Sequence, residues 1–411
     1  MKKYFFFVII SLLAISLLQC SNPISSPVQI KKNITSSDKQ LVKSSELFGL
    51  KLFKQVNQAA GDTNIFISPL SVSTALGMVL NGANGKTYDE MKSVLELPGN
   101  SQDEVNQSYQ NLNNLLTQID PKVIFESANS IWYKQNLTFE QSFLDVNKTY
   151  FDAQVQALNF ADPSSVNTIN NWVSEKTKQK ITSIIKSIPD GAVMYLINAI
   201  YFKGTWLYKF DSTATKDDNF YVTTGNPVIC RMMNQKNKFE YYKADNYQAI
   251  ELPYGDGDFQ MLVILPSSGS DINSLINQMD ENYWNNLLTS MDSAEVNLWL
   301  PKFKVEYSIT LNDALKALGM TSAFAPFVAD FSKIRKEKDL FISRVLHKTY
   351  VKVDEEGTEA AAVTAIEMGT TAVGPGEKQI YMKVDHPFIF AIRENTSGAI
   401  LFIGKVVNPN Q

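Results

Sequence analysis

Residues 354–380 read DEEGTEAAAVTAIEMGTTAVGPGEKQI, and this stretch constrains the fold more than any other. Such a run of small residues with Gly and Pro indicates a long exposed loop. Its first half nevertheless alternates as a strand does, because side chains point to opposite faces at successive positions. One face would carry only small or apolar residues: Thr358, Ala360, Ala362, Thr364, Ile366 and Met368. Glu359 and Glu367 would lie on the other face. An ordinary strand or an Ala-rich helix fits this pattern, and a loop that can become a central strand is a further interpretation of it.

The rest of the chain predicts helices mainly in its first half and strands mainly in its second half. Helical spacing is expected over residues 44–60, from Ser68 as N-cap with Pro69 as first helical residue, and from Ile169 onward. Strands are expected at residues 65–67, 194–202, 259–265 and 296–300, with a hairpin formed by residues 388–393 and 399–406. The sequence has no internal repeat and no linker after residue 45, so it predicts one α+β domain.

The N-terminus has the features of an export signal. Lys2 and Lys3 precede an apolar run over residues 5–18, which is too short to span a bilayer. Cys20 stands where bacterial lipoproteins carry their acylated cysteine, although Gln19 is larger than the usual Ala, Gly or Ser. We expect residues 1–19 to be a signal peptide, residues 20–43 a lipid-attached polar tether and residues 44–411 the folded domain. The protein would be exported to the cell envelope or the extracellular space, touching a membrane only through its lipid. The alternative is an ordinary signal with a chance cysteine and a freely secreted protein.

The composition argues against a nucleic-acid partner. The 411 residues are 44% apolar and 19% charged, with a net charge of −4 of mixed sign, so nucleic acid is not expected as a partner. Lysines gather at Lys176, Lys178, Lys180 and Lys186, which we interpret as the solvated face of a helix. If Cys20 is acylated, Cys230 is the one remaining cysteine and no intrachain disulfide can form.

Catalytic and cofactor motifs are missing from the sequence. There is no Cys-x-x-Cys, no His pair at i, i+4, no GxSxG and no phosphate-binding glycine loop. A Ser–His–Asp site would need His347 or His386, the two histidines present. No metal, cofactor or catalytic residue is expected. A hydrolase with a pair of carboxylates stays open as an alternative.

Several blocks of sequence resemble one family. Residues 355–362 (EEGTEAAA) are similar to the hinge of inhibitory serpins, the serine protease inhibitor family. Similar blocks follow the family's order along nearly the whole chain: residues 64–71 (NIFISPLS), 198–206 (NAIYFKGTW), 300–303 (LPKF), 329–332 (ADFS), 347–348 (HK), 385–388 (DHPF) and 402–409 (FIGKVVNP). The resemblance implies helices packed on a large, mostly antiparallel central sheet, two further sheets and an exposed reactive-centre loop at about residues 356–380.

The resemblance also implies a function. A suicide-type inhibitor of this family is cut in its bait loop, and the cut loop inserts into the central sheet while the protease is held as a distorted acyl-enzyme. Counting from the hinge places the bait bond at Thr371–Ala372, with cleavage after Met368, Thr370 or Ala372 as alternatives. Because Thr371 is uncharged, elastase-like, subtilisin-like or cysteine proteases are expected as partners, and the inhibitor is expected to be a monomer. A non-inhibitory serpin remains an alternative, although such members usually lose the small hinge residues.

Specific roles carry over to matching positions. The hinge would comprise Glu356, Gly357, Thr358, Glu359, Ala360, Ala361 and Ala362. Trp206 matches the tryptophan at the top of the sheet, the breach, where insertion starts. Ser68, Ser71, Asn198 and His347 match the polar cluster beneath the opening strands, the shutter. His347 is therefore expected to support a conformational switch, and His386 to be structural.

Overall fold

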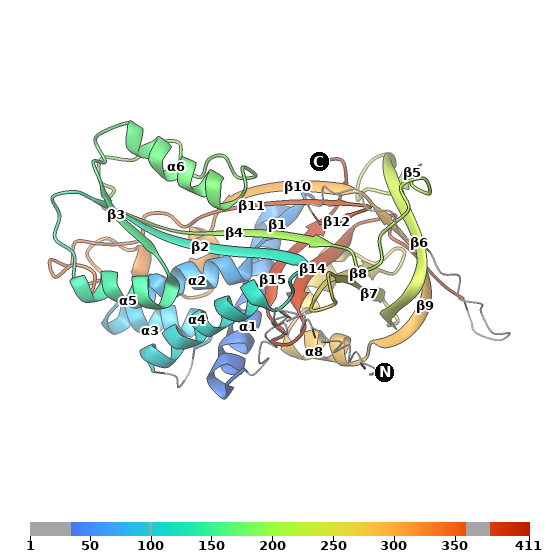
Figure 1. The fold of residues 1–411 in the computed structure, drawn as a ribbon, viewed down its shortest axis with the longest axis horizontal. Coiled ribbons are helices and arrows are strands. Elements are labelled where there is room, and N and C mark those ends of the chain that lie inside the picture. Colours follow the sequence, from blue (N-terminus) through green and yellow to red (C-terminus); the bar gives the residue numbers. More distant parts are fainter. Residues whose placement is uncertain (1–33, 98, 100, 359–378) are drawn as a thin grey trace, which may run out of the picture. The chain divides into compact units, whose positions relative to one another are not determined.

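The computed structural model describes residues 34–97, 99, 101–358 and 379–411 (Figure 1). The helices in this part of the chain are α1 (Ser36–Ala60), α2 (Pro69–Leu80), α3 (Gly85–Val94), α4 (Gln102–Gln118), α5 (Gln141–Phe151), α6 (Ser164–Lys176), α7 (Ile272–Gln278), α8 (Glu281–Thr289), α9 (Asn312–Ala317) and the 3-10 helix η1 (Ser322–Phe324). The strands are β1 (Ile65–Ile67), β2 (Val123–Lys134), β3 (Gln154–Leu158), β4 (Met194–Thr205), β5 (Lys216–Phe220), β6 (Val228–Lys243), β7 (Tyr247–Tyr254), β8 (Phe259–Pro266), β9 (Asp292–Pro301), β10 (Phe303–Thr310), β11 (Leu346–Asp354), β12 (Gly357–Thr358), β13 (Ile380–Lys383), β14 (Phe388–Glu394) and β15 (Ile400–Val406). None of the described helices has the length and apolar character needed to cross a membrane.

The first helix begins earlier than the sequence predicts. Thr35 is its N-cap, and a capping box joins the Thr35 side chain to the Asp38 backbone and the Asp38 side chain to the Thr35 backbone. Leu41 and Val42 are buried, so the apolar stripe starts before residue 44. The predicted boundary between tether and domain at residues 43 and 44 is therefore wrong for residues 36–43, which belong to α1.

Helix α2 confirms its predicted start. The Ser68 side chain accepts a hydrogen bond from the Ser71 N–H, and Pro69 occupies the first helical position, where a missing N–H costs nothing. Almost every side chain of α2 is buried, because the helix packs against both β4 and β15. The strand before it, β1, pairs with β15 in the same core.

The strands form two sheets. One has the order β1-β15-β14-β8-β7-β6-β9-β13, with β5 also paired to β6, and the other has the order β10-β11-β12-β4-β2-β3. The α+β class is confirmed. Three sheets were expected, but within the described residues the long strand β6 pairs with β5, β7 and β9 and thereby joins two of them.

The six-stranded sheet is covered on both faces. Helix α6 packs on β2 and β4 from one side, while α2 contacts β4 and α4 contacts β2 from the other (Figure 1). Ile197 and Ala199 of β4 join the cluster under α6, which includes Trp132 and Trp172 with ring centroids 6.0 Å apart. Alternate residues of β4 therefore face opposite layers.

The predicted helical face of lysines is wrong beyond Lys176, where α6 ends. Lys178 has a positive φ of 48° and pairs with Glu126 at 2.9 Å, and Lys180 lies over the Tyr350 ring. These lysines lie in the turn that follows the helix.

Candidate functional site

The hinge begins as a two-residue strand inside the six-stranded sheet. After β11 the chain turns at Glu355 and Glu356, and β12 returns antiparallel between β11 and β4. Thr358 is opposite Val353 on one side and Gly204 on the other. Toward the N-terminal ends of β4 and β11, the part of the chain that the structure describes places no strand between these two strands. The two strands are parallel and are separated there, and β12 enters this separation only at their C-terminal ends.

Gly357 is required by its surroundings. Its φ is 150°, and a Cβ at this position would lie 2.1 Å from the Gly204 carbonyl oxygen. A side chain would push β12 away from β4, so a glycine is needed where the chain enters β12.

Trp206, which the resemblance assigns to the breach, lies directly against the turn that leads into β12. Its indole Nε1 donates to the Asp354 carbonyl at 2.9 Å, and its backbone N–H donates to the Glu356 carbonyl at 2.9 Å. The ring stacks on Tyr254 with centroids 4.4 Å apart. The Tyr254 hydroxyl is hydrogen-bonded in turn to the Thr358 hydroxyl, and Thr358 is only 2% exposed. Tyr254 thus connects Trp206 to the Thr358 side chain of β12.

Two lysines hold the turn between β11 and β12. Lys302 contacts the Glu355 carboxylate at 2.6 Å, and Lys209 contacts Glu356 at 2.6 Å. Burial alone would raise the pKa of Glu355, but hydrogen bonds from Lys302, Thr215 and its own backbone keep that pKa below the ordinary value. We call Lys209, Lys302, Glu355 and Glu356 the hinge clamp.

Three of the four predicted shutter residues are joined. The Ser68 N–H donates to His347 Nε2 at 3.0 Å, and the Ser68 hydroxyl donates to the Leu401 carbonyl at 2.6 Å. Ser71 N–H donates to the Ser68 hydroxyl at 3.2 Å. Burial lowers the pKa of His347 to about 4, so the ring is neutral and suited to accept this bond.

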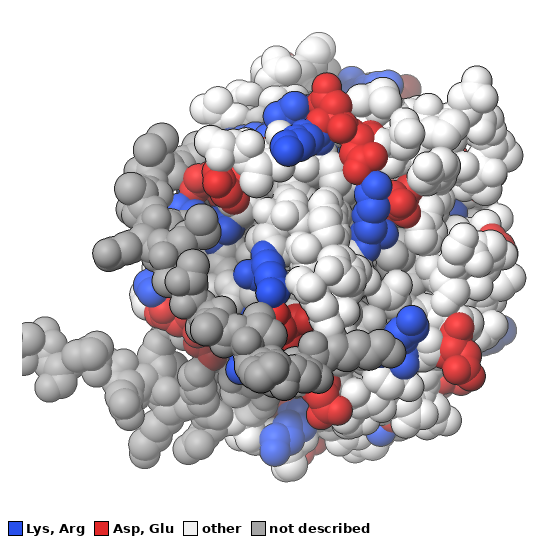
Figure 2. Space-filling view, turned by 90° about the vertical axis from the view of Figure 1, so that its right-hand side faces the viewer, with Lys and Arg blue, Asp and Glu red and all other residues white. Residues whose placement is uncertain are grey.

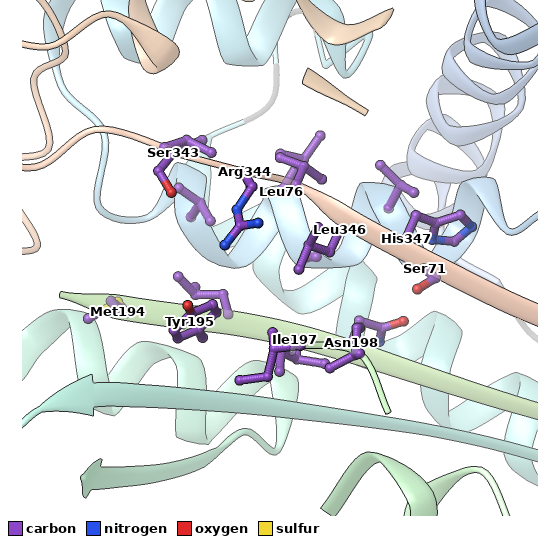
Figure 3. Close-up of a pocket in the computed structure, with 18 of the residues that line it drawn as sticks. Ser71, Leu76, Met194, Tyr195, Ile197, Asn198, Ser343, Arg344, Leu346 and His347 are labelled. Carbon is purple, nitrogen blue, oxygen red and sulfur yellow. The ribbon is translucent and has the colours of Figure 1, made fainter. Parts of the chain in front are cut away.

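Asn198 stands apart from these three residues. Its side-chain amide donates to Asn129 at 2.8 Å and to Ser127 at 3.1 Å, both on β2. Its buried Oδ1 has no hydrogen-bond partner among the described residues. Figure 3 shows Asn198 on β4 and His347 on β11 facing one opening, with Ser71 close to His347. The predicted cluster is therefore split across the separation between the strands.

A cavity occupies that separation. One wall includes Leu196, Asn198 and Ile200 of β4. The opposite wall includes His347 and Thr349 of β11 and Val345 just before that strand. Ser68 and Ser71 at the start of α2 also line the cavity, and Figure 3 shows Ser71 near His347. The cavity is lined as far as Ile200 on β4 and Thr349 on β11, so it lies on the N-terminal side of the positions in these strands that pair with β12.

Other predicted residues have different outcomes. Glu359, Ala360, Ala361, Ala362, Thr371, Ala372 and Cys20 lie outside the described residues. His386 contacts Asp385 at 2.9 Å and the Pro266 carbonyl at 2.8 Å, away from the shutter. Sequence reasoning missed Tyr254 and Lys209, whose contacts reach across the chain to Thr358 and Glu356. Lys302 stands in a block that was recognised, but without a role.

Comparisons with known proteins agree with this geometry. The family model "Serpin (serine protease inhibitor)" matches residues 43–409. The chain is 36% identical over 383 residues to the leukocyte elastase inhibitor of Sus scrofa, covering 90% of this chain and all of that protein. A native-state structure of the thermophilic serpin tengpin aligns with a TM-score of 0.82 at 34% identity, covering 92% of this chain and 95% of that one. Human thyroxine-binding globulin complexed with its ligand aligns with a TM-score of 0.82 at 26% identity, covering 92% of this chain and 100% of that one. Because the family model covers residues 43–409 and a relative at 36% identity is matched over its whole length, the chain belongs to the serpin family.

Proposed function

We propose that this protein is a suicide inhibitor that lets a protease cut its loop at about Thr371–Ala372 and then traps the acyl-enzyme as the cut loop inserts between β4 and β11. Residues 359–378 lie outside the described structure, so the proposal depends on the fixed strands at the start of the loop. Family membership alone does not establish inhibition, since a thyroxine-binding protein has the same fold.

The observation that carries the proposal is the placement of β12. It is antiparallel to both neighbours and already pairs with each of them. Continued in the same register, the strand would place Thr364 between Asn198 and His347. The hydroxyl of a threonine there would meet both halves of the split shutter, including the unpaired Asn198 Oδ1.

The side-chain alternation of the loop matches this slot. Thr358 points inward to Tyr254, so a continued strand would direct its small and apolar face inward as well. Glu359 and Glu367 would lie on the opposite face. Each new ladder bond contributes roughly 1 kcal/mol net, and burying the inward side chains adds to that. Charge and size therefore favour insertion of this particular loop.

The target class follows from the loop and from a relative. Thr371 is uncharged, which favours elastase-like, subtilisin-like or cysteine proteases over trypsin-like ones. The name of a relative, the leukocyte elastase inhibitor of Sus scrofa, also supports an elastase-like target.

The test is to mix the purified protein with a panel of these proteases and examine denaturing gels, with mass spectrometry of the released peptide. A covalent complex and a peptide beginning at Ala372 are expected. A complex with another peptide would move the bond and keep the mechanism. Cleaved protein without any complex across the panel would reject inhibition in favour of a non-inhibitory role.

A hinge variant sharpens the test. Thr358→Arg should still be cut but should form little or no complex, because an arginine cannot be buried where Thr358 is 2% exposed beside Tyr254. Thr224→Arg, at an exposed position in the turn before β6, is the matched control and should trap like the parent protein. Equal trapping by Thr358→Arg would contradict insertion through this slot.

We also propose that the protein is exported and anchored by lipid at Cys20, on the strength of the N-terminal sequence alone. Globomycin treatment of a bacterial expression host should accumulate an unprocessed form, and Cys20→Ser should abolish lipid labelling. Processing and labelling that continue in Cys20→Ser would reject the anchor.

A further inference from the structure

The strand that follows the loop presents aromatic side chains to solvent. Tyr381 on β13 is 58% exposed, and its ring stacks on half-buried Trp299 of β9 with centroids 6.1 Å apart and planes 18° apart. Strand β13 pairs in parallel with β9, which places Tyr381 beside Asn297. Alternate residues Leu298 and Met382 are fully buried. The aromatic pair therefore lies on the outer face of the sheet.

The pair is held in place by its neighbours. The Tyr381 hydroxyl is hydrogen-bonded to the Gln379 side chain at 2.7 Å, and Asn234 donates to Asn297 at 2.8 Å. Nearby charges are neutralised, since Lys236 pairs with Glu295 at 2.7 Å and Lys383 with Asp218 at 2.8 Å. Figure 2, which views this end of the molecule, shows mostly uncharged surface with charged groups of both signs between. The surface is aromatic, is held by hydrogen bonds and ion pairs, and has no dominant charge.

We propose that Trp299 and Tyr381 form a secondary docking surface for the protease that attacks the loop. The inference deepens the proposed function and rests on it. Ala372 and Tyr381 are nine positions apart (381 − 372), so even extended chain separates them by only about 30 Å, roughly the diameter of a small domain. A protease seated on the bait bond is thus within reach of the aromatic pair.

The chemistry of the surface indicates what it contacts. Tyrosine and tryptophan are the residues most often found as energetic anchors of protein interfaces, because they bury large area with few rotatable bonds. Because the flanking lysines are already paired, the surface fits an apolar and amide-rich rim of the protease more than a charged one. Its contribution should therefore depend little on salt.

The experiment compares association rate constants for the protease that forms the most complex in the panel. Tyr381→Ala in the full chain should lower the rate constant about tenfold, which corresponds to loss of one interface anchor. Tyr381→Phe keeps the ring and should stay within about twofold of the parent protein. The stoichiometry of inhibition and the effect of salt should be unchanged, because the surface acts before cleavage.

Phe327→Ala is the matched control. Phe327 is fully exposed, but it follows η1, which packs on α3 at the opposite end of the chain's fold from β9 (Figure 1). An unchanged rate constant for Tyr381→Ala would overturn the docking surface, as would an equal loss for Phe327→Ala. Failure of the parent protein to form any covalent complex would instead reject the proposed function itself.

Discussion

At the scale of single residues, His347 has a defined protonation state. Its Nε2 accepts the Ser68 N–H, which a protonated ring could not do. Its side chain is buried, and burial lowers its pKa to about 4, whereas the pKa of a histidine in the unfolded chain is about 6.5. Between these two pH values the unfolded state binds a proton that the folded state does not bind. The free energy of unfolding therefore falls as pH falls through this range.

We therefore predict a pH-dependent contribution from His347. At pH 5 the histidine should cost the fold about 2 kcal/mol relative to pH 8. His347→Gln should reduce the difference between melting temperatures at pH 5 and pH 8, whatever its effect at pH 8 alone. An unchanged difference would contradict a buried neutral ring.

His386→Gln provides a control of opposite sign. Burial opposes a charge on His386, yet its hydrogen bonds to Asp385 and the Pro266 carbonyl raise its pKa. Its stabilising effect is present below the unfolded pKa and is lost as pH rises through the folded one. The two substitutions should thus change the pH profile in opposite directions.

How far single residues could be predicted depends on how local their contacts are. Ser68 was recognised as an N-cap because its partner Ser71 is three positions away. Asn198 was placed with His347, but it bonds to Asn129 because β2 and β4 pair in that register. Such a register is fixed by the whole sheet, and no pattern near Asn198 could have supplied it.

At the scale of elements, the hinge clamp positions β12. The lysine contacts to Glu355 and Glu356 are supported by backbone bonds, since the N–H groups of Trp206 and Phe210 donate to the carbonyls of the same two glutamates. Among the residues that the structure describes, β12 comprises Gly357 and Thr358, so the placement of these two residues depends on the turn more than on their own ladder.

We predict that Lys209→Ala weakens trapping by loosening the turn. Glu356 would lose its partner, the start of insertion would be delayed, and more of the protein would be cut as substrate. The stoichiometry of inhibition should rise about two- to fivefold, consistent with a partly exposed pair worth less than about 1 kcal/mol. Lys336→Ala, which removes an exposed pair with Glu140, should leave it unchanged. A stoichiometry equal to that of the parent protein would show that Lys302 and the backbone bonds suffice.

Elements could be predicted where apolar spacing was strong. The core strands β4, β8 and β9 and the hairpin of β14 and β15 were all confirmed, because nearly continuous or alternating apolar runs mark them. The start of α1 was missed because its first turns are rich in Ser and Lys and are set by the Thr35 capping box. The alternation from Thr358 onward indicated a strand, but the register of β12 could not be predicted from spacing, because it is set by pairing with both β4 and β11.

At the scale of the whole molecule, the six-stranded sheet is incomplete in a specific way. Strand β4 extends over residues 194–205 and β11 over residues 346–354, and within the described part of the chain, which stops at Thr358 and resumes at Gln379, β12 pairs with each of them at Gly357 and Thr358 alone. Nearer their N-terminal ends, the facing edges of β4 and β11 line the cavity. The Asn198 Oδ1 on this part of β4 has no hydrogen-bond partner among the described residues. Filling that slot with a strand from the same chain would add ladder bonds on two sides and bury an apolar face, so the intact fold is expected to be less stable than the cleaved one.

The final prediction measures this difference directly. After limited cleavage between Met368 and Gly374, the protein should melt at a temperature more than about 20 °C above that of the intact protein, because insertion adds stability on the order of 10 kcal/mol. Thr358→Arg cut at the same bond should show little or no rise, since its loop cannot pass the first buried position beside Tyr254. The comparison separates insertion from cleavage itself. A cleaved parent protein that melts with the intact one would mean that the separation between β4 and β11 does not accept the loop, and would remove the energetic basis for trapping a protease.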